Sequence, residues 1–223
     1  DRLDSLTSWR ADWAGLRVAV LGLGVTGFAV ADTLAELGAT VLVIAGRPDE
    51  ERERILEVIG VEMVVEPDAA AVPSELEQFA PELVVVSPGY HPDHRLVRWA
   101  EDRGTPIIEL AWRLRDKVEP AAEWMLITGT NGKTTTTGMT AHLLRTAGLR
   151  AVEAGNIGVP VLDAIRDPQG FDAIVVELSS YQCQSLTVSP DIVVLTSLFP
   201  EHLDWHGSSE QYYADKLNVA AHH

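Results

Sequence analysis

Trp124-Met-Leu-Ile-Thr-Gly-Thr-Asn-Gly-Lys-Thr134 joins a short apolar run to a glycine-rich segment. The apolar part predicts a buried strand, and the residues after Thr134 predict a helix that closes at Gly148. A loop between a strand and a helix turns backbone N–H groups toward the helix N-terminus, where they can bind a phosphate. Lys133 adds a positive charge there, and the hydroxyl of Thr134 can bind Mg²⁺. The segment therefore predicts an α/β domain with a nucleotide site.

This loop is shorter than the common P-loop, which needs a glycine at position 127, where the sequence has Ile127. The alternative interpretation is a glycine-rich turn with a solvated lysine. We disfavour it because packing alone does not explain Gly-Lys-Thr-Thr after an apolar strand. The candidate ATP-binding residues are Gly129, Thr130, Asn131, Gly132, Lys133, Thr134 and Thr135.

A second strand-loop-helix unit lies near the N-terminus. The run 16–21 predicts a strand, Gly22-x-Gly24-x-x-Gly27 opens a helix, and 40–44 predicts the next strand. This βαβ order is typical of a Rossmann-like parallel sheet. Further strands are expected at 61–65, 83–86 and 106–108, and helices at 48–59, 92–102 and 110–118.

The glycine motif does not by itself define the ligand. NAD binding needs an acidic residue near the end of the second strand for the ribose hydroxyls, and the sequence there is Ala45-Gly46-Arg47. We therefore disfavour NAD, although the loop can still hold a pyrophosphate and Arg47 can meet a phosphate or a base. Ser87-Pro88-Gly89 is a second candidate loop at the ligand edge, and an ordinary Pro-Gly turn explains it equally well.

The segment 117–122 predicts a linker, and we place a domain boundary near residue 120, between domains 1–119 and 120–223. In the second domain we expect strands at 150–153, 173–177 and 192–196 and a helix at 159–166. Ser208 is the predicted N-cap of a last helix, with Gln211 placed to complete a capping box. The fold class is α/β: a Rossmann-like N-terminal domain followed by a P-loop-type ATP-binding domain, which we expect to be truncated.

Polar residues follow the later strands of the second domain. Glu177 ends a strand, and carboxylates at that end of a parallel strand face the ligand crevice. Mg²⁺ prefers such oxygen ligands, although an exposed strand-end glutamate is the alternative. His202 and Asp204 follow another strand and are weaker candidates, because a histidine in a loop is usually structural. His206 is expected at the surface.

Two other polar residues carry little signal by themselves. Lys216 on the last helix is by position an ordinary surface lysine, and Asn156 between glycines is a typical turn residue.

Composition limits the class of protein. With 17 basic and 33 acidic residues the net charge is −16, which disfavours nucleic acid and anionic membranes as partners. The single cysteine, Cys183, excludes an intrachain disulfide and a cysteine-based zinc site. The sequence has no apolar run of 18 residues and no signal-peptide core near Asp1–Asp12, so we expect a cytoplasmic protein without a membrane span.

Taken together, the motifs resemble the Mur ligases, and within them the D-glutamate-adding type. The phosphate loop alone is also similar to that of folylpolyglutamate synthetases. The matching segments run in the family's order from about residue 16 to 216: Gly-Leu-Gly-x-Thr-Gly at 22–27, Ser-Pro-Gly at 87–89, Gly-Thr-Asn-Gly-Lys-Thr at 129–134, Gly-Asn-Ile-Gly at 155–158, Glu-Leu-Ser-Ser-Tyr-Gln at 177–182 and His-Leu-Asp at 202–204.

The resemblance implies substrates and site residues. The N-terminal domain is expected to hold the UDP part of UDP-N-acetylmuramoyl-L-alanine, and the central domain to bind ATP and Mg²⁺. Thr134, Glu177, His202 and a carbamylated Lys216 are the implied metal ligands. The implied catalytic residues are Lys133, Asn156, His202 and Lys216. The implied UDP-substrate residues are Gly24, Val25, Thr26, Gly27, Arg47, Ser87, Pro88, Gly89 and Asn156.

The implied reaction is amide formation with D-glutamate through an acyl phosphate, carried out by a monomer. Ala45-Gly46 stands where the family often has an acidic residue near the uracil. We therefore expect the affinity for uracil, or its pose, to differ from that in the family. Family members also carry a longer central domain and a third domain, so we expect this chain alone to bind ligand at best. The alternatives are a ligase for another amino acid, a non-catalytic nucleotide-binding module, or a fragment that serves only in folding or interaction.

Overall fold

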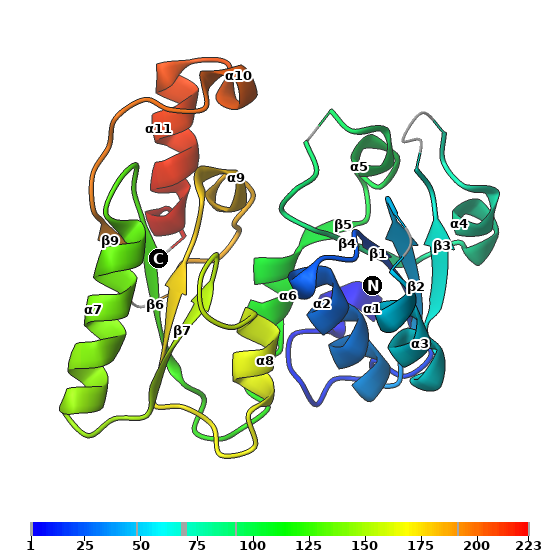
Figure 1. Ribbon diagram of the computed structural model, residues 1–223, viewed down its shortest axis with the longest axis horizontal. Coiled ribbons are helices and arrows are strands. Elements are labelled where there is room, and N and C mark those ends of the chain that lie inside the picture. Colours follow the sequence, from blue (N-terminus) through cyan, green and yellow to red (C-terminus); the bar gives the residue numbers. More distant parts are fainter. Residues whose placement is uncertain (1, 48, 68–70, 92, 191, 223) are drawn as a thin grey trace. The chain divides into compact units, whose positions relative to one another are not determined.

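The chain forms two compact units, Asp1–Leu110 and Ala111–His223. The computed structural model describes residues 2–47, 49–67, 71–91, 93–190 and 192–222, and Figure 1 shows their helices and strands. The division falls inside α6 (Ile107–Arg113), ahead of the linker expected at 117–122. Which ligand each unit takes stays a prediction.

A parallel sheet of five strands forms the centre of the first unit, in the order β3-β2-β1-β4-β5. From the central β1 the chain first builds one side of the sheet and then the other, so its direction reverses between β1 and β4. Ligands of such sheets bind beyond the carboxyl ends of the strands at that reversal. The predicted Rossmann-like fold is confirmed. The strands are β1 (Arg17–Leu21), β2 (Thr40–Ala45), β3 (Glu62–Val65), β4 (Leu83–Val86) and β5 (Gly104–Pro106).

Both faces of this sheet are covered, because successive strand residues point to opposite sides. Leu21 of β1 packs in a buried cluster with Leu76 of α4 (Ser74–Phe79). Its neighbour Val20 is fully buried on the opposite face, where α2 (Val25–Glu36) contacts β1 and β2. Helices on both faces explain why these strands are apolar without alternation.

In this unit one element differs in kind from the sequence expectation, and one helix was not expected. Ile107 and Ile108 begin α6 instead of ending a strand, because a short apolar run does not distinguish a buried helix from a buried strand. Helix α4 was not expected, since its segment has few apolar residues, of which Leu76 is fully buried.

Two expected helices are shorter than predicted. The helix at 48–59 is α3 (Glu50–Val58), which begins after Asp49, whose side chain accepts a hydrogen bond from the Arg52 N–H. The helix at 92–102 is α5 (Arg95–Trp99). The expected first residues of both, Pro48 and Pro92, lie outside the described residues. A short helix α1 (Arg2–Ser5) precedes β1.

The second unit contains a parallel sheet of four strands in the order β7-β8-β6-β9. Helix α7 (Lys133–Thr146) covers one face, where Ala141 packs with Ile127 and Val175. The carboxyl ends of β6, β8 and β9 lie side by side, so the loops that follow them share one edge. The strands are β6 (Glu123–Thr128), β7 (Ala151–Gly155), β8 (Ala173–Glu177) and β9 (Ile192–Leu195), and the other helices are α8 (Val161–Arg166), α9 (Ser180–Cys183), α10 (Leu203–His206), α11 (Ser209–Leu217) and the 3₁₀ turn η1 (Asn218–Ala220).

The capping prediction for α11 is half right. The Ser208 side chain accepts a hydrogen bond from the Gln211 N–H, as expected for an N-cap. The Gln211 amide, however, donates to Asp215 Oδ1 at 2.7 Å and does not complete the box. A full capping box forms instead between Ser179 and Gln182 at α9. Among the described residues, no helix is long and apolar enough to cross a membrane.

Candidate functional site

The predicted phosphate loop lies between β6 and α7 and is braced by the segment after β9. The Thr130 N–H donates to the Ser197 carbonyl at 2.8 Å, and the Asn131 N–H donates to Ser197 Oγ at 2.9 Å. Gly129 has φ +146°, and a Cβ there would stand 2.0 Å from Thr196 Oγ1. Glycine at 129 is therefore required both by its backbone conformation and by the closeness of the β9 loop.

Lys133 is the first residue of α7, and its side chain folds back over the loop. Its Nζ donates to the carbonyls of Gly129 at 2.9 Å and Thr130 at 3.0 Å. The first N–H groups of a helix have no partner within the helix, so those of α7 are open to an anion beside this ammonium group. The arrangement provides a positive charge and backbone donors in one place.

The end of β8 brings a carboxylate to the start of α7. Thr134 Oγ1 donates to Glu177 Oε2 at 2.9 Å, and Glu177 is 4% exposed. A hydroxyl oxygen and a carboxylate are the ligand types that a hard cation prefers, so the chemistry of this pair fits Mg²⁺. The Asn156 N–H donates to the Glu177 carbonyl at 3.1 Å, which brings the exposed Asn156 to the same strand end.

Lys216 is buried in the second unit, contrary to the surface position that its sequence context alone suggests. It is 2% exposed, and its Nζ donates to Thr128 Oγ1 at 3.3 Å. Burial lowers the pKa of Lys216, and the nearby Lys133 lowers it further. Its amine is therefore easier to deprotonate than that of an exposed lysine.

His202 is the N-cap of α10 and Asp204 lies in its first turn, ahead of α11; both are exposed. His202 adopts φ +52°, and its ring contacts Tyr181 of α9 with centroids 5.1 Å apart. Among the described residues, no three or more His, Cys, Asp or Glu side chains form a cluster able to hold a metal. The structure thus brings together Thr134, Glu177 and Asn156. Lys216 contacts the hydroxyl of Thr128, the last residue of β6.

The prediction for His206 is wrong. Its side chain is fully buried: Nδ1 contacts Asp215 Oδ2 at 2.5 Å and Nε2 lies 3.0 Å from Ser180 Oγ. Its ring stacks on Tyr181. The sequence carried no sign of this, because its two polar partners, Asp215 and Ser180, lie on other helices, 9 and 26 residues away.

Most of the N-terminal candidate residues line a cavity of about 480 Å³ at the reversal between β1 and β4. Ser87 Oγ is buried there without a hydrogen-bond partner, one of two such side-chain atoms among the described residues. A Cβ at Gly27 would stand 2.1 Å from the Gly22 carbonyl, so the motif's glycines allow the loop and α2 to meet closely. The lining residues are Gly24, Thr26, Gly27, Ser87, Pro88, Gly89, Tyr90 and His94.

Two lining residues were missed, and two predicted residues of this unit do not line the cavity; Asn156, also predicted, belongs to the second unit. Tyr90 and His94 meet edge to face with ring centroids 4.7 Å apart, and Tyr90 directly follows the Ser-Pro-Gly segment, which could have marked it. Val25 and Arg47 are exposed and do not line the cavity. Burial raises the pKa of Tyr90 and lowers that of His94, so both rings are expected to be neutral.

The lone cysteine is expected to be unreactive in the folded protein. Cys183 is fully buried, and burial raises the pKa of its thiol to about 11. Because the folded pKa is raised, the thiol favours the folded state at neutral pH and this contribution is lost as the pH rises through 11. Iodoacetamide at pH 8 should label Cys183 only after denaturation, as followed by mass spectrometry. Equally fast labelling of the native chain would contradict its burial.

Comparison with known proteins supports the sequence interpretation. A family model for the MurD-like N-terminal domain of Mur ligases matches residues 16–109, and one for the Mur ligase middle domain matches residues 127–223. The chain is 56% identical to UDP-N-acetylmuramoylalanine--D-glutamate ligase of Leifsonia xyli subsp. xyli, over 98% of this chain and 45% of that protein. It is 46% identical to the ligase of the same name from Tropheryma whipplei strain Twist, over 98% of this chain and 46% of that one.

A solved structure shares the fold. The UDP-N-acetylmuramate:L-alanyl-gamma-D-glutamyl-meso-diaminopimelate ligase from Neisseria meningitides aligns with a TM-score of 0.55 and 20% identity, over 93% of this chain and 68% of that one. The chain therefore belongs to the Mur ligase family, of which it carries N-terminal and middle domains. Within that family, its N-terminal domain is of the MurD-like type. The chain spans a little under half the length of the curated relatives described above.

Proposed function

We propose that this chain provides two domains of an ATP-dependent amide ligase that joins D-glutamate to UDP-N-acetylmuramoyl-L-alanine in peptidoglycan synthesis. The observation that carries the proposal is the phosphate loop with its Thr134–Glu177 pair, in a chain 56% identical to a protein named as that ligase. The full-length protein, meaning this chain with the remaining length of its relatives, would work in the cytoplasm as a monomer on small molecules. Nucleic acid is not an expected partner of an acidic chain.

The reaction requires the middle domain to neutralise phosphate charge and to align the nucleotide. The substrate carboxylate attacks the γ-phosphorus of ATP, which releases ADP and gives an acyl phosphate. The amine of D-glutamate then forms the amide bond and releases phosphate. Lys133 and the open N–H groups of α7 would neutralise the phosphate charge and align the nucleotide. Asn156, close to Glu177, would contact the reacting carboxylate or the γ-phosphate.

Thr134, Glu177, His202 and Lys216 would hold Mg²⁺, which supplies further neutralisation of phosphate charge when bound. Lys216 suits this role only after its amine has added CO₂, because an ammonium group repels a cation. That step forms a carbamate N–C bond, releases a proton and turns the side chain into an anion with oxygen ligands. The lowered pKa of Lys216 favours it by increasing the neutral amine.

A carbon-13 experiment tests this role of Lys216. With ¹³C-bicarbonate at pH 8, the chain should give a carbamate signal in its ¹³C NMR spectrum that is absent from Lys216→Arg. Lys117→Arg is the matched control and should keep the signal. A spectrum unchanged by Lys216→Arg would remove Lys216 from the proposed metal ligands.

The first domain would hold the UDP moiety in the 480 Å³ cavity. Ser87 Oγ, which is buried without a partner, would bond to the ligand. Ser87→Ala should raise the KM for the UDP-substrate in the full-length protein by about tenfold, the worth of one hydrogen bond to a charged group, with kcat little changed. Ser74→Ala, on α4 outside the cavity lining, is the control. An unchanged KM would place Ser87 outside the site.

The amino-acid substrate distinguishes the proposal from its alternatives. Phosphate release by the full-length protein with ATP, Mg²⁺ and UDP-N-acetylmuramoyl-L-alanine should be stimulated by D-glutamate and not by L-lysine, meso-diaminopimelate or L-alanine. Stimulation by another member of this set would indicate a different ligase of the family. The 223-residue chain alone should show no turnover, and robust ligase activity from it would contradict the need for further domains.

A further inference from the structure

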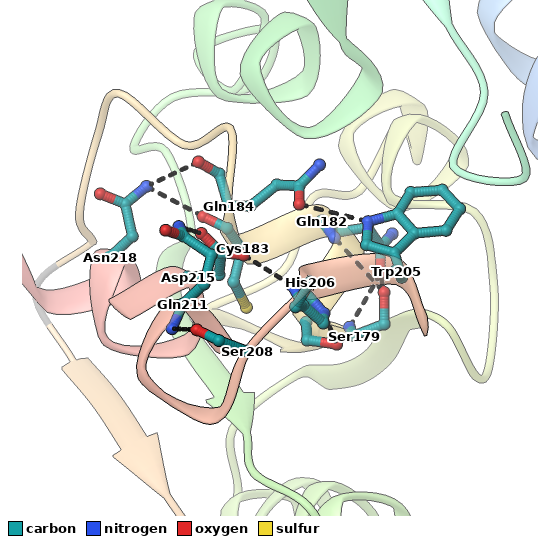
Figure 2. Close-up of polar contacts among 11 residues, drawn as sticks. Ser179, Gln182, Cys183, Gln184, Trp205, His206, Ser208, Gln211, Asp215 and Asn218 are labelled. Carbon is teal, nitrogen blue, oxygen red and sulfur yellow. Dashed lines mark hydrogen bonds and ion pairs between the residues drawn. The ribbon is translucent and has the colours of Figure 1, made fainter. Parts of the chain in front are cut away.

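A buried relay of three side chains connects three separate segments of the second unit. His206 of α10 contacts Asp215 of α11 through Nδ1 at 2.5 Å and Ser180 of α9 through Nε2 at 3.0 Å. Gln211 donates to the second carboxylate oxygen of Asp215 at 2.7 Å, and Figure 2 shows the polar contacts around His206 and Asp215. The side chain of His206 is 0% exposed and that of Asp215 is 12% exposed. The proposed reaction uses none of these groups.

The relay members lie close in sequence to the proposed metal ligands. Ser180 is the first residue of α9 and comes three positions after Glu177, the last residue of β8. His206 is the last residue of the short helix α10, whose N-cap is His202, and the His206 N–H donates to the His202 carbonyl at 3.0 Å. Asp215 directly precedes Lys216 on α11. The segments that bring Glu177, His202 and Lys216 thus each contain one member of the relay, and Thr134 comes from α7.

We propose that Ser180, His206 and Asp215 act as a positioning relay that fixes the loop of His202 and the helix of Lys216 against the end of β8, so that the metal-binding side chains are held in one arrangement. This inference rests on the proposed function. The three residues do not touch the metal or the substrates; they act through the ligands that they hold.

Ring contacts extend the relay in two directions. Tyr181 stacks parallel to His206 with centroids 5.7 Å apart and also meets the ring of His202, so it holds both histidines of the loop. On the other side His206 meets Tyr212 edge to face, and the Tyr212 hydroxyl bonds to Thr130 Oγ1 of the phosphate loop at 2.7 Å. A displaced His206 would therefore disturb both the His202 loop and the phosphate loop.

The hydrogen-bonding roles are set by the partners. A carboxylate only accepts, so Nδ1 of His206 carries the proton that it shares with Asp215. The Ser180 hydroxyl carries both a donor and lone pairs, so it can complete the contact at Nε2. Removing one member leaves buried polar partners unpaired, which costs more than the bond alone.

Metal binding without turnover tests the relay directly. Full-length protein is mixed with a non-hydrolysable ATP analogue and with Mn²⁺ in place of Mg²⁺. Electron paramagnetic resonance then measures the Mn²⁺ that remains free. Ser180→Ala and His206→Ala should weaken Mn²⁺ binding by about tenfold, the lower end for losing a group that supports a metal ligand. His206→Gln keeps an amide near the Nε2 position and should restore part of the loss. His142→Gln, at an exposed site on α7, is the control and should bind as the parent does.

Two further readouts separate positioning from a loss of folding. Affinity for UDP-N-acetylmuramoyl-L-alanine, measured by calorimetry, should stay within about twofold in all variants, since each folds and its first domain is unchanged. Ser180→Ala is the decisive variant because it removes only a hydroxyl. Folded Ser180→Ala and His206→Gln proteins that both bind Mn²⁺ as tightly as the parent would overturn the relay. Absence of Mn²⁺ binding in the parent would instead contradict the proposed function.

Discussion

Replacing Lys133 by methionine should lower kcat of the full-length protein by about 10²- to 10³-fold, the usual effect of removing one preorganised charge from a transition state. Methionine retains the length of the side chain and its packing but lacks the ammonium group. In the folded chain that group lies against the Gly129 and Thr130 carbonyls, at the N-terminus of α7. Lys133 is the one lysine of α7, so no other lysine of this helix could supply the missing charge. The measurement is ADP release at saturating substrates.

The control for this variant is Lys117→Met, since Lys117 lies in the segment between α6 and β6, outside both candidate sites. It should keep kcat within about twofold. Lys133→Met should also unfold at nearly the parent temperature, because it removes two hydrogen bonds to loop carbonyls without opening a cavity. Parent-like ADP release from a folded Lys133→Met protein would exclude the loop as the ATP phosphate site.

Replacing Gly129 by alanine should destabilise the 223-residue chain by roughly 2–4 kcal/mol, combining left-handed backbone strain with overpacking. The backbone at Gly129 has φ +146°, which alanine rarely adopts. Its Cβ would also stand 2.0 Å from Thr196 Oγ1 and 3.0 Å from the Ser197 nitrogen, and the latter atom belongs to the backbone. The loop after β9 would have to move. Urea unfolding measures the free energy.

Gly138→Ala provides the opposite expectation in the same element. Gly138 lies inside α7, and a Cβ there meets nothing within 4 Å. Alanine should therefore stabilise the chain by about 0.5–1 kcal/mol through helix propensity. Equal free energies of unfolding for the two variants would mean that the phosphate loop is not braced by the β9 segment as described.

Local patterns were sufficient to predict the architecture. Apolar runs that lead into glycine-rich turns fixed the expectation for β1 and β6, and the structure has parallel sheets around both. The pattern could not separate helix from strand at Ile107, where burial and not periodicity makes the run apolar. Helix α4 escaped prediction because a helix that buries mainly Leu76 needs only a short apolar stripe.

The candidate site residues also fall into those that the local sequence predicts and those that it does not. Residues at or shortly after strand ends, such as Lys133, Glu177 and Ser87, could be proposed from the sequence because a strand end determines which edge of the sheet they occupy. The burial of Lys216 and His206 was not predictable, since both lie on amphipathic segments whose partners come from elsewhere in the chain. Long-range contacts of that kind leave no mark on a single sequence.

Ligand-induced stabilisation of the 223-residue chain tests the central claim most directly. Thermal unfolding should be measured with UDP-N-acetylmuramoyl-L-alanine, Mg²⁺-ATP or NAD added separately. A ligand present at about 100 times its Kd adds roughly 2.7 kcal/mol to the stability of the state that it binds. The ligase account predicts a higher unfolding temperature with the UDP-substrate and no change with NAD. Stabilisation by NAD alone would contradict it and indicate a Rossmann-type cofactor module.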